Sequence, residues 1–154
     1  MLSDPHTELA AIGGVFAALF AAHQVGDYWV QTDHQAVTKA RPGWVGRLAC
    51  ATHVTTYTLT ACVALVFLAA ATGWRPDVDS AVTGLLISAV SHYVADRRAV
   101  VAWLVEHANL ARFYVLGAPR PDRDDNPTLG TGAHALDQSW HIGWLFLSAL
   151  FIAA

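Results

Sequence analysis

Charged residues are scarce in this sequence. They make up 14% of its 154 residues, whereas hydrophobic residues make up 55%. A soluble domain of ordinary composition carries about 25% charged residues, so this chain has too few to cover a water-facing surface. The formal net charge of −3 provides no basic excess, which argues against nucleic acid as a partner. Few charges and long apolar stretches together indicate a membrane protein whose main partner is the lipid bilayer.

Cysteine is also rare, and several catalytic motifs are missing. The two cysteines, Cys50 and Cys62, lie in one apolar segment, and neither has a second cysteine at metal-ligand spacing. We interpret both as small buried apolar residues. The sequence has no G-x-S-x-G motif and no P-loop, so a serine nucleophile and a Walker-type nucleotide site have no support. Lysine and arginine are absent before the first apolar run, so we expect no cleaved signal peptide.

Four apolar segments are each close to the roughly 20 residues that a helix needs to cross the hydrocarbon core. They cover about residues 9–31, 48–71, 80–96 and 135–154. The sequence therefore predicts an all-α fold: one integral membrane domain, residues 1–154, built as a four-helix transmembrane bundle. The last two segments are only moderately apolar, which leaves buried helices of a soluble protein as the alternative. An additional amphipathic segment, "RRAVVAWLVEHANLARFYVL", either extends the third helix or lies along the membrane surface.

Basic residues are distributed unevenly between the connections of these segments. The first–second and third–fourth connections carry every lysine and arginine except Arg75. Lysine and arginine collect on the cytoplasmic side of membrane helices. We therefore predict a multi-pass protein of the inner (cytoplasmic) membrane, with both of these connections inside and both termini outside. The short outer turn "ATGWRPDVDS" contains a predicted helix N-cap at Asp79 or Ser80.

Each apolar segment contains a polar stripe that includes a histidine. His23 and Asp27 are four residues apart, and so are His92 and Asp96, so each pair shares one helix face. At 1.5 Å per residue, the four stripes all lie within roughly 12 Å of the predicted cytoplasmic boundary. Stripes from four helices at one depth predict a single cluster between the helices. The candidate metal ligands in it are His23, Asp27, His53, His92, Asp96, Asp137 and His141.

Charged and polar groups inside a membrane segment are costly to bury without a partner. Imidazoles and carboxylates from facing helices form a ligand set that suits zinc first, with manganese, iron or nickel as alternatives. Seven candidates exceed the needs of one tetrahedral ion, so either two ions bind or some residues orient the ligands. The alternative is a metal-free hydrogen-bond network that includes Gln31, Tyr57 and Gln138. We predict surface positions for His6, His34 and His107, and leave His134 open.

The stripes lie in the blocks "AHQVGDYWVQTD", "THVTTY", "SHYVAD" and "LDQSWH". In this order they resemble a family of small bacterial and phage membrane proteins defined only as a domain of unknown function (number 3307). The resemblance spans nearly the whole chain and implies a helical membrane protein with a His, Asp and Gln signature. A weaker similarity, carried by the His-x3-Asp pairs and Gly26–Asp27, is to zinc-dependent phospholipase C and P1-type nucleases. Membrane proteins described as metal-dependent hydrolases share the same style of His and Asp residues.

Three functions are consistent with this pattern. The first is a metal-dependent hydrolase of a phosphoester or lipid-like substrate, with Arg97 and Arg98 binding phosphate at the mouth of the site. The second is an oligomeric protein that handles ions or protons, since the apolar outer halves of the helices argue against a pore in one subunit. The third is a non-catalytic structural or assembly subunit. Small residues at Gly14, Ala18 and Ala22 favour close helix packing, within the bundle or in a homo-oligomer. The hydrolase is our leading hypothesis, and whether the protein is an enzyme stays open.

Overall fold

The computed structural model describes residues 5–120 and 130–154, and every regular element in these ranges is helical. The predicted all-α fold is therefore confirmed for the described part of the chain. The first half contains α1 (Pro5–Val25), which continues into a π-helical segment η1 (Gly26–Val30), then α2 (Asp33–Thr38) and α3 (Gly43–Thr72). The second half contains α4 (Val78–Asp96), α5 (Ala99–His107), α6 (Ala111–Tyr114) and α7 (Gly132–Ala153).

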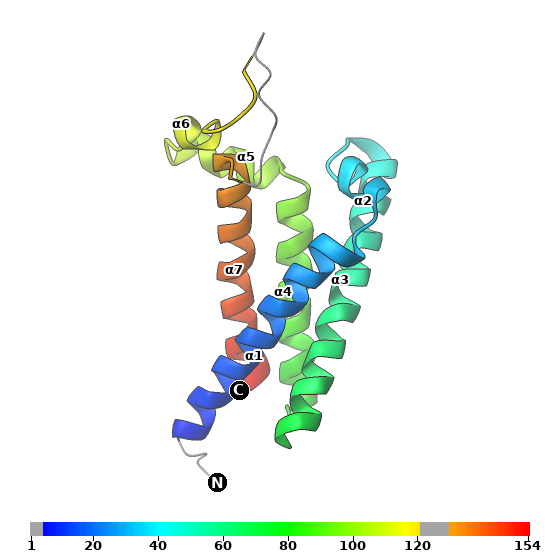
Figure 1. Cartoon of the computed structure of the whole chain (residues 1–154), viewed down its shortest axis with the longest axis vertical. Coiled ribbons are helices and arrows are strands. Elements are labelled where there is room, and N and C mark those ends of the chain that lie inside the picture. The colour runs from blue at the N-terminus through cyan, green and yellow to red at the C-terminus, as the bar shows by residue number, and fades with distance from the viewer. Residues whose placement is uncertain (1–4, 121–129) are drawn as a thin grey trace.

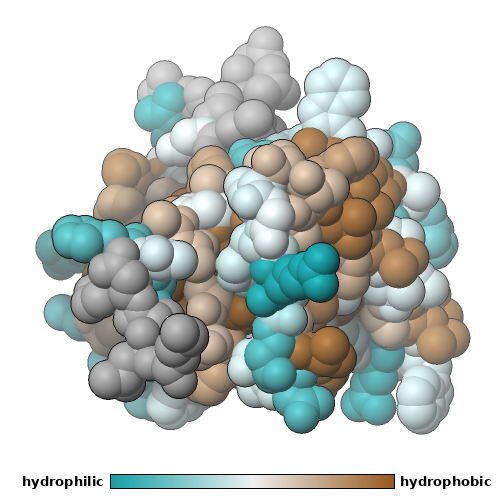
Figure 2. Space-filling model, turned by 90° about the horizontal axis from the view of Figure 1, so that it is seen from below, coloured by the Kyte–Doolittle hydropathy of each residue, from teal (hydrophilic) through white to brown (hydrophobic). Residues whose placement is uncertain are grey.

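Three helical segments are long and apolar enough to cross a membrane. They are His6–Val30, Gly43–Thr72 and Val78–Asp96. Large apolar side chains along them face outward, among them Leu59, Phe67 and Leu86. Figure 2, which looks onto one end of the molecule, shows apolar residues over much of the surface with hydrophilic residues between them. These features indicate a membrane protein, because such helices expose more apolar surface than water tolerates.

The four long helices lie side by side and alternate in direction (Figure 1). α1 begins and α7 ends at the same end of the bundle, and α2, α5 and α6 lie at the other end. Buried apolar residues of α1, α3 and α7, including Leu19, Ala61 and Ala149, form the core between the helices. α4 packs closely on α7 at Gly84, where an added Cβ would collide with the side chain of Ile152.

α7 differs in character from the other three long helices. It has 22 residues, more than the 19 of α4, but it is not among the candidate membrane spans because it is less apolar. The polar residues in its first half, Asp137, Gln138 and His141, lower its hydropathy. The described residues therefore contain three candidate membrane spans where the sequence predicted four.

Several helix boundaries differ from the predicted ones, and local capping explains them. α3 begins at Gly43, directly after Pro42 in extended backbone, rather than near residue 48. It ends at Gly73, which adopts the left-handed conformation that favours glycine. α4 is capped by Asp77, whose carboxylate accepts a hydrogen bond from the Ser80 amide at 2.9 Å. This corrects the prediction of a cap at Asp79 or Ser80, and the bond holds the pKa of the Asp77 carboxyl below its usual value.

The connection between α1 and α3 contains a helix that the sequence analysis did not predict. α2 begins with a capping box, in which Thr32 accepts from the Gln35 amide and the Gln35 side chain accepts from the Thr32 amide. The T-x-x-Q spacing that produces this box is a readable signal in the sequence. The Gln35 side-chain amide also donates to the Thr52 hydroxyl at 3.4 Å, and this bond joins α2 to α3.

The amphipathic segment after α4 turns away from the bundle axis. Arg98 has a φ of 60°, which ends α4 and redirects the chain into α5. α5 and α6 consequently cross the end of the bundle and do not extend α4 (Figure 1). α5 buries Val101 and Val105 in a small apolar cluster with Ala95, Leu136 and Trp140. Helices α5 and α6 therefore cover the ends of α4 and α7.

Candidate metal centre

The polar stripes of the four long helices meet at the end of the bundle next to α2 and α5. His23, His53, His92 and Asp96 are each at most 4% exposed, and the side chain of Asp27 is 11% exposed. His141 of α7 is also buried, at 4% exposed. Six of the seven predicted site residues therefore lie in one buried region. Their meeting agrees with the prediction from depth along the helices.

Four of these residues form a compact group that we call the His/Asp cluster: Asp27, His53, His92 and Asp96. Nε2 of His53 lies 3.0 Å from Nε2 of His92. Oδ2 of Asp96 is 3.3 Å from both of these nitrogens. Oδ1 of Asp27 is 3.4 Å from the His53 nitrogen and 3.5 Å from the His92 nitrogen. Both carboxylates thus face the same pair of imidazole nitrogens, and the ligand atoms of His53, His92 and Asp96 are close enough together to hold a metal ion.

The two carboxylate oxygens in this cluster lack hydrogen-bond donors. Oδ1 of Asp27 and Oδ2 of Asp96 are buried, and among the described residues neither accepts a hydrogen bond. Burying an ionised carboxylate is costly unless it is paired or bound to a metal. Both oxygens therefore depend on the nearby histidine nitrogens, or on a bound cation, for a partner.

Neighbouring side chains fix the orientation of the histidine of α4. The ring of Tyr57 stacks on the ring of His92 with their centroids 4.2 Å apart. The Tyr57 hydroxyl is 2.6 Å from the hydroxyl of Ser88, one turn before His92. Gly26 gives Tyr57 the room for this position, because an added Cβ would approach the tyrosine ring to 3.2 Å. Close approach of α1 to α3 thus supports the cluster.

The π-helical segment η1 begins directly before Asp27. A π-helical turn inserts one extra residue into a helix, and such turns occur frequently at functional sites. His23 and Asp27 remain close across this turn, with Nδ1 and Oδ2 3.5 Å apart. Residue spacing alone predicted that contact but did not predict the π turn.

Lys39 is a member of the site that the sequence analysis missed. Its ammonium group lies 2.7 Å from Oδ1 of Asp96, which leaves the other oxygen facing the histidines. The Arg97 guanidinium donates to the backbone carbonyls of Lys39 and Arg41 and so holds this connection against the end of α4. The only signal for this role in the sequence is that Lys39 is the single lysine in the connection before α3. Its position could not be predicted, because that connection has no apolar periodicity.

A second pair of histidines lies beside the His/Asp cluster. The rings of His23 and His141 stack with their centroids 4.8 Å apart and an interplanar angle of 19°. Nδ1 of His141 is 2.8 Å from the backbone carbonyl of Asp137. We call these two residues the His23–His141 pair.

Asp137 lies apart from the cluster. Its carboxylate is 34% exposed, 3.7 Å from Nδ1 of His141, and close to the Gln138 amide. His134, which the sequence left open, lies near the Tyr28 hydroxyl at 3.5 Å. His6, His34 and His107 are exposed, as predicted.

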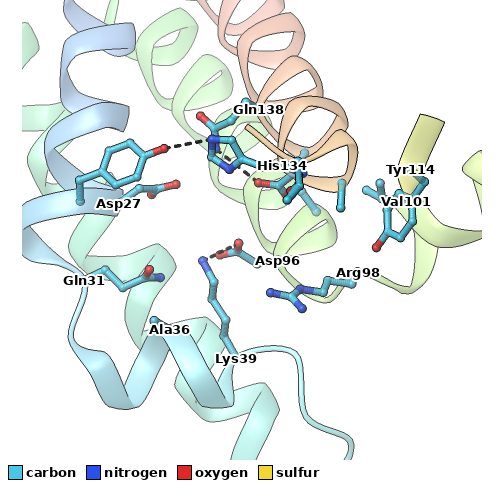
Figure 3. Close-up of a pocket in the computed structure, with 15 residues that line it drawn as sticks. Asp27, Gln31, Ala36, Lys39, Asp96, Arg98, Val101, Tyr114, His134 and Gln138 are labelled. Atoms are coloured by element: carbon cyan, nitrogen blue, oxygen red, sulfur yellow. Dashed lines mark hydrogen bonds and ion pairs between the residues drawn. The ribbon is translucent and has the colours of Figure 1, made fainter. Parts of the chain in front are cut away.

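The site opens into a cavity of about 470 Å³ at this end of the bundle. Figure 3 shows Lys39 beside Asp96 near the middle of the view, with Asp27 and Gln31 to their left, Arg98 to their right and His134 above them. Val101 and Tyr114 from the α5–α6 segment complete the wall. The cavity therefore combines three carboxylates, those of Asp27, Asp96 and Asp137, with the cationic side chains of Lys39 and Arg98, and it is large enough for a small ligand or a head group.

Fold and site together define an all-helical membrane protein with a buried centre of histidines and aspartates. The sequence profile of the family described as "Protein of unknown function (DUF3307)" matches residues 15–153, so the chain belongs to this family. The resemblance seen in the four sequence blocks is thereby confirmed. No curated protein and no solved structure matches the chain significantly. The similarity to phospholipase C, nucleases and other hydrolases consequently has no support from these comparisons.

Proposed function

We propose that the His/Asp cluster binds a divalent metal ion, with zinc as the best fit. A tetrahedral ion with ligands at about 2.0–2.1 Å holds its ligand atoms about 3.3–3.4 Å apart. The ligand atoms of His53, His92 and Asp96 are 3.0–3.3 Å apart, and Oδ1 of Asp27 lies 3.4–3.5 Å from the two histidine nitrogens. This match for His53, His92 and Asp96, in a buried site where Oδ1 of Asp27 and Oδ2 of Asp96 accept no hydrogen bond from the described residues, is the observation that carries the proposal.

The contact between Lys39 and Asp96 supports the same role. A carboxylate ligand is commonly oriented by a second group that binds its free oxygen. Lys39 binds Oδ1 of Asp96 at 2.7 Å and so directs Oδ2 toward the histidines. With both carboxylates ionised and the histidines neutral, a divalent ion and Lys39 leave one net positive charge, which favours an anionic ligand in the cavity.

We further propose that the protein is a metal-dependent hydrolase of a phosphoester or a lipid-like substrate. A bound zinc or manganese ion supplies a Lewis acid and lowers the pKa of a bound water toward neutrality. The cavity beside the cluster admits a phosphate group between Lys39 and Arg98. Arg97, the other arginine predicted to bind phosphate, is instead engaged with backbone carbonyls, so we assign that role to Arg98.

The position of the site favours a substrate at the membrane surface. We propose that α1, α3, α4 and α7 all cross the inner (cytoplasmic) membrane, with the α2 and α5–α6 end facing the cytoplasm. The basic connections lie at this end, as the distribution of lysine and arginine requires. A cavity at the end of a membrane bundle is accessible to lipid head groups. Both chain termini then face outward.

The test is elemental analysis of detergent-purified protein without an affinity His-tag. We expect bound transition metal in the wild type and a substoichiometric amount in His53→Ala and Asp96→Asn. His107→Ala is the matched control, because this histidine is exposed at the other face of α5 and should leave the metal content unchanged. A screen of phosphomonoesters, phosphodiesters and phospholipids then compares the wild type with Asp27→Asn.

A metal-free wild type, even after incubation with zinc or manganese, would contradict the proposal. The alternative is then a non-catalytic structural subunit or an ion-handling oligomer with a polar network. The specific observation in favour of this alternative is the 3.0 Å separation of the His53 and His92 nitrogens, which also fits a direct hydrogen bond. Metal binding without turnover of any of these substrates would support the metal site but contradict the proposal that the protein is a hydrolase.

A further inference from the structure

A second concave surface, a groove of about 510 Å³, lies between α4 and α7. α4 contributes Leu86, Val90 and Val94 to its lining, and α7 contributes Trp140 and Trp144. Leu86 and Val90 are 59% and 61% exposed, so the groove opens to the outside of the bundle. Its lining residues differ from those of the cavity beside the His/Asp cluster, so the two are separate sites.

The wall of the groove on α7 is held in place by a contact with α4. Nε1 of Trp140 donates a hydrogen bond to the backbone carbonyl of Ser91 at 3.1 Å. The rings of Trp140 and Trp144 lie beside each other with their centroids 5.8 Å apart. Trp140 also packs against the apolar cluster of α5 that contains Val101. Because the indole N–H of Trp140 is bonded within the protein, this ring presents apolar surface to the groove.

The length and position of the groove match one leaflet of a bilayer. The groove follows α4, a candidate membrane span, from Leu86 to Val94. This stretch of helix corresponds to about 12 Å, and one leaflet of the hydrocarbon core is about 15 Å deep. Val94 is close to the end of α4 at Asp96, and Trp140 reaches the α5 cluster. The groove therefore covers most of the depth of the leaflet next to α5.

A groove at this depth contacts either lipid or another protein helix. Helix–helix interfaces in membranes are enriched in small residues, which allow the backbones to approach closely. The lining here consists of large side chains apart from Ser91, and Ser91 is only 7% exposed. A flexible hydrocarbon chain can follow such a surface, so lipid fits the groove better than a second copy of the chain does.

We infer that the groove between α4 and α7 binds one acyl chain of a phospholipid from the leaflet next to α5 and α6. The inference goes beyond the proposed function and rests on it only in that α7 crosses the membrane beside α4. The chain contacts both helices, and the head group lies at the level of α5. A lipid bound in this way stabilises the contact between the helices that contain His92 and His141.

The test counts retained lipid and locates it. Detergent-purified protein is reconstituted into vesicles of phosphatidylglycerol and phosphatidylethanolamine, the latter with a diazirine in one acyl chain, and is then extracted again into detergent. Native mass spectrometry counts the phospholipid that remains bound. Irradiation and peptide mapping then locate the chain. We expect one retained phospholipid in the wild type, cross-linked within residues 86–94 and 140–144.

Two variants change the groove in opposite ways. Val90→Trp fills it from an exposed position, and Trp144→Ala removes part of one wall, so both should lose the retained lipid. Leu59→Trp is the matched control, because Leu59 is 60% exposed on α3 and does not line the groove. Every variant is checked for wild-type helicity and a monodisperse elution profile, and the cross-linking of the wild type depends on no variant.

The possible outcomes separate the inference from the proposed function. A wild type without retained phospholipid overturns the inference, and so does a lipid that cross-links outside the groove or remains bound in both variants. A dimer without lipid also overturns it, because a second copy would then cover the groove. The metal content of the same samples is measured separately. A metal-free protein with a chain in the groove contradicts only the proposed function, and a metal-loaded protein without lipid contradicts only the inference.

Discussion

The ammonium group of Lys39 lies at the edge of the His/Asp cluster, where it pairs with a buried carboxylate. It neutralises Asp96 at 2.7 Å, and it comes from a connection that Arg97 holds against α4. Lys39 is 12% exposed and Asp96 is 4% exposed, so water screens this ion pair only weakly. Breaking such a pair leaves an uncompensated buried charge, and this penalty exceeds the net stability that the intact pair contributes.

We predict that Lys39→Met destabilises the metal-free protein by about 3–5 kcal/mol, the range for removing one partner of a buried pair. The double variant Lys39→Met/Asp96→Asn should recover part of this loss, because it removes the unpaired carboxylate as well. The free energy of unfolding in mixed micelles, with EDTA present, measures both variants. Equal losses in the single and double variants would show that the ion pair is not the cause.

The Asp77 cap gives α4 a dependence on pH. Its hydrogen bonds to the Ser80 amide lower the pKa of the carboxyl from 3.8 in the folded protein. Its stabilising effect is therefore complete above the unfolded value and is lost as the pH falls through the lower folded value. We predict that Asp77→Ala lowers Tm at pH 7 and that the difference from the wild type shrinks below pH 3.8. Thermal melts across this range, with Asp79→Ala as control, check it; a constant difference would contradict the cap.

At the scale of helices, regular spacing predicted much of the site. The i, i+4 spacing placed His23 beside Asp27 and His92 beside Asp96, and common depth brought both pairs to His53. These predictions succeeded because helix geometry converts sequence separation into direction. The place of Lys39 could not be predicted in this way. It lies in a connection without apolar periodicity, and tertiary packing brings that connection to Asp96.

The position of Asp137 illustrates the limit of the same reasoning. Spacing placed it on the helix face of His141, but its carboxylate lies at the cavity wall and is 34% exposed. Which of two residues on one face reaches the centre depends on the rotation of α7 against α4, and no local signal in the sequence encodes this rotation. The helix starts at Gly43 and Val78 were missed for another reason, because caps outside the apolar runs determine them.

Close packing of α4 on α7 positions the two histidines on these helices. A Cβ at Gly84 would collide with the Ile152 side chain and the Ser148 carbonyl, whereas a Cβ at Gly143 would meet nothing within 4 Å. We predict that Gly84→Ala destabilises the protein by about 1–3 kcal/mol through overpacking. Gly143→Ala, the matched control on α7, should be neutral or stabilising by about 0.5–1 kcal/mol. Unfolding in mixed micelles measures both, and equal effects would contradict this packing role.

The contacts of Arg97 predict a local effect on the connection before α3. Arg97→Gln removes the guanidinium that binds the carbonyls of Lys39 and Arg41. We expect faster hydrogen–deuterium exchange in residues 39–46, weaker metal retention through the loosened Lys39, and unchanged exchange in α1. Arg98→Gln is the control, because that side chain faces the cavity. Unchanged exchange in residues 39–46 would show that other contacts hold the connection.

For the whole molecule, the arrangement of the helices predicts which segments each side of the membrane can reach. In a background with Cys50 and Cys62 replaced by alanine, His34→Cys tests the α2 end and Asp79→Cys tests the opposite end. We predict that a membrane-impermeant maleimide labels Asp79→Cys from outside intact cells and labels His34→Cys only after the inner membrane is opened. The reverse pattern would invert the proposed orientation and place the cavity on the outer face.

The order of the buried His and Asp residues along the chain determines the order in which they become available during synthesis. Asp27, His53, His92 and Asp96 all lie in or before α4, so every residue of the His/Asp cluster is present once three long helices have been synthesised. The His23–His141 pair forms only once α7 is made, which follows these three helices in the chain. A nascent chain that stalls after α4 therefore already carries the four residues of the His/Asp cluster, but it lacks the His141 ring that stacks on His23.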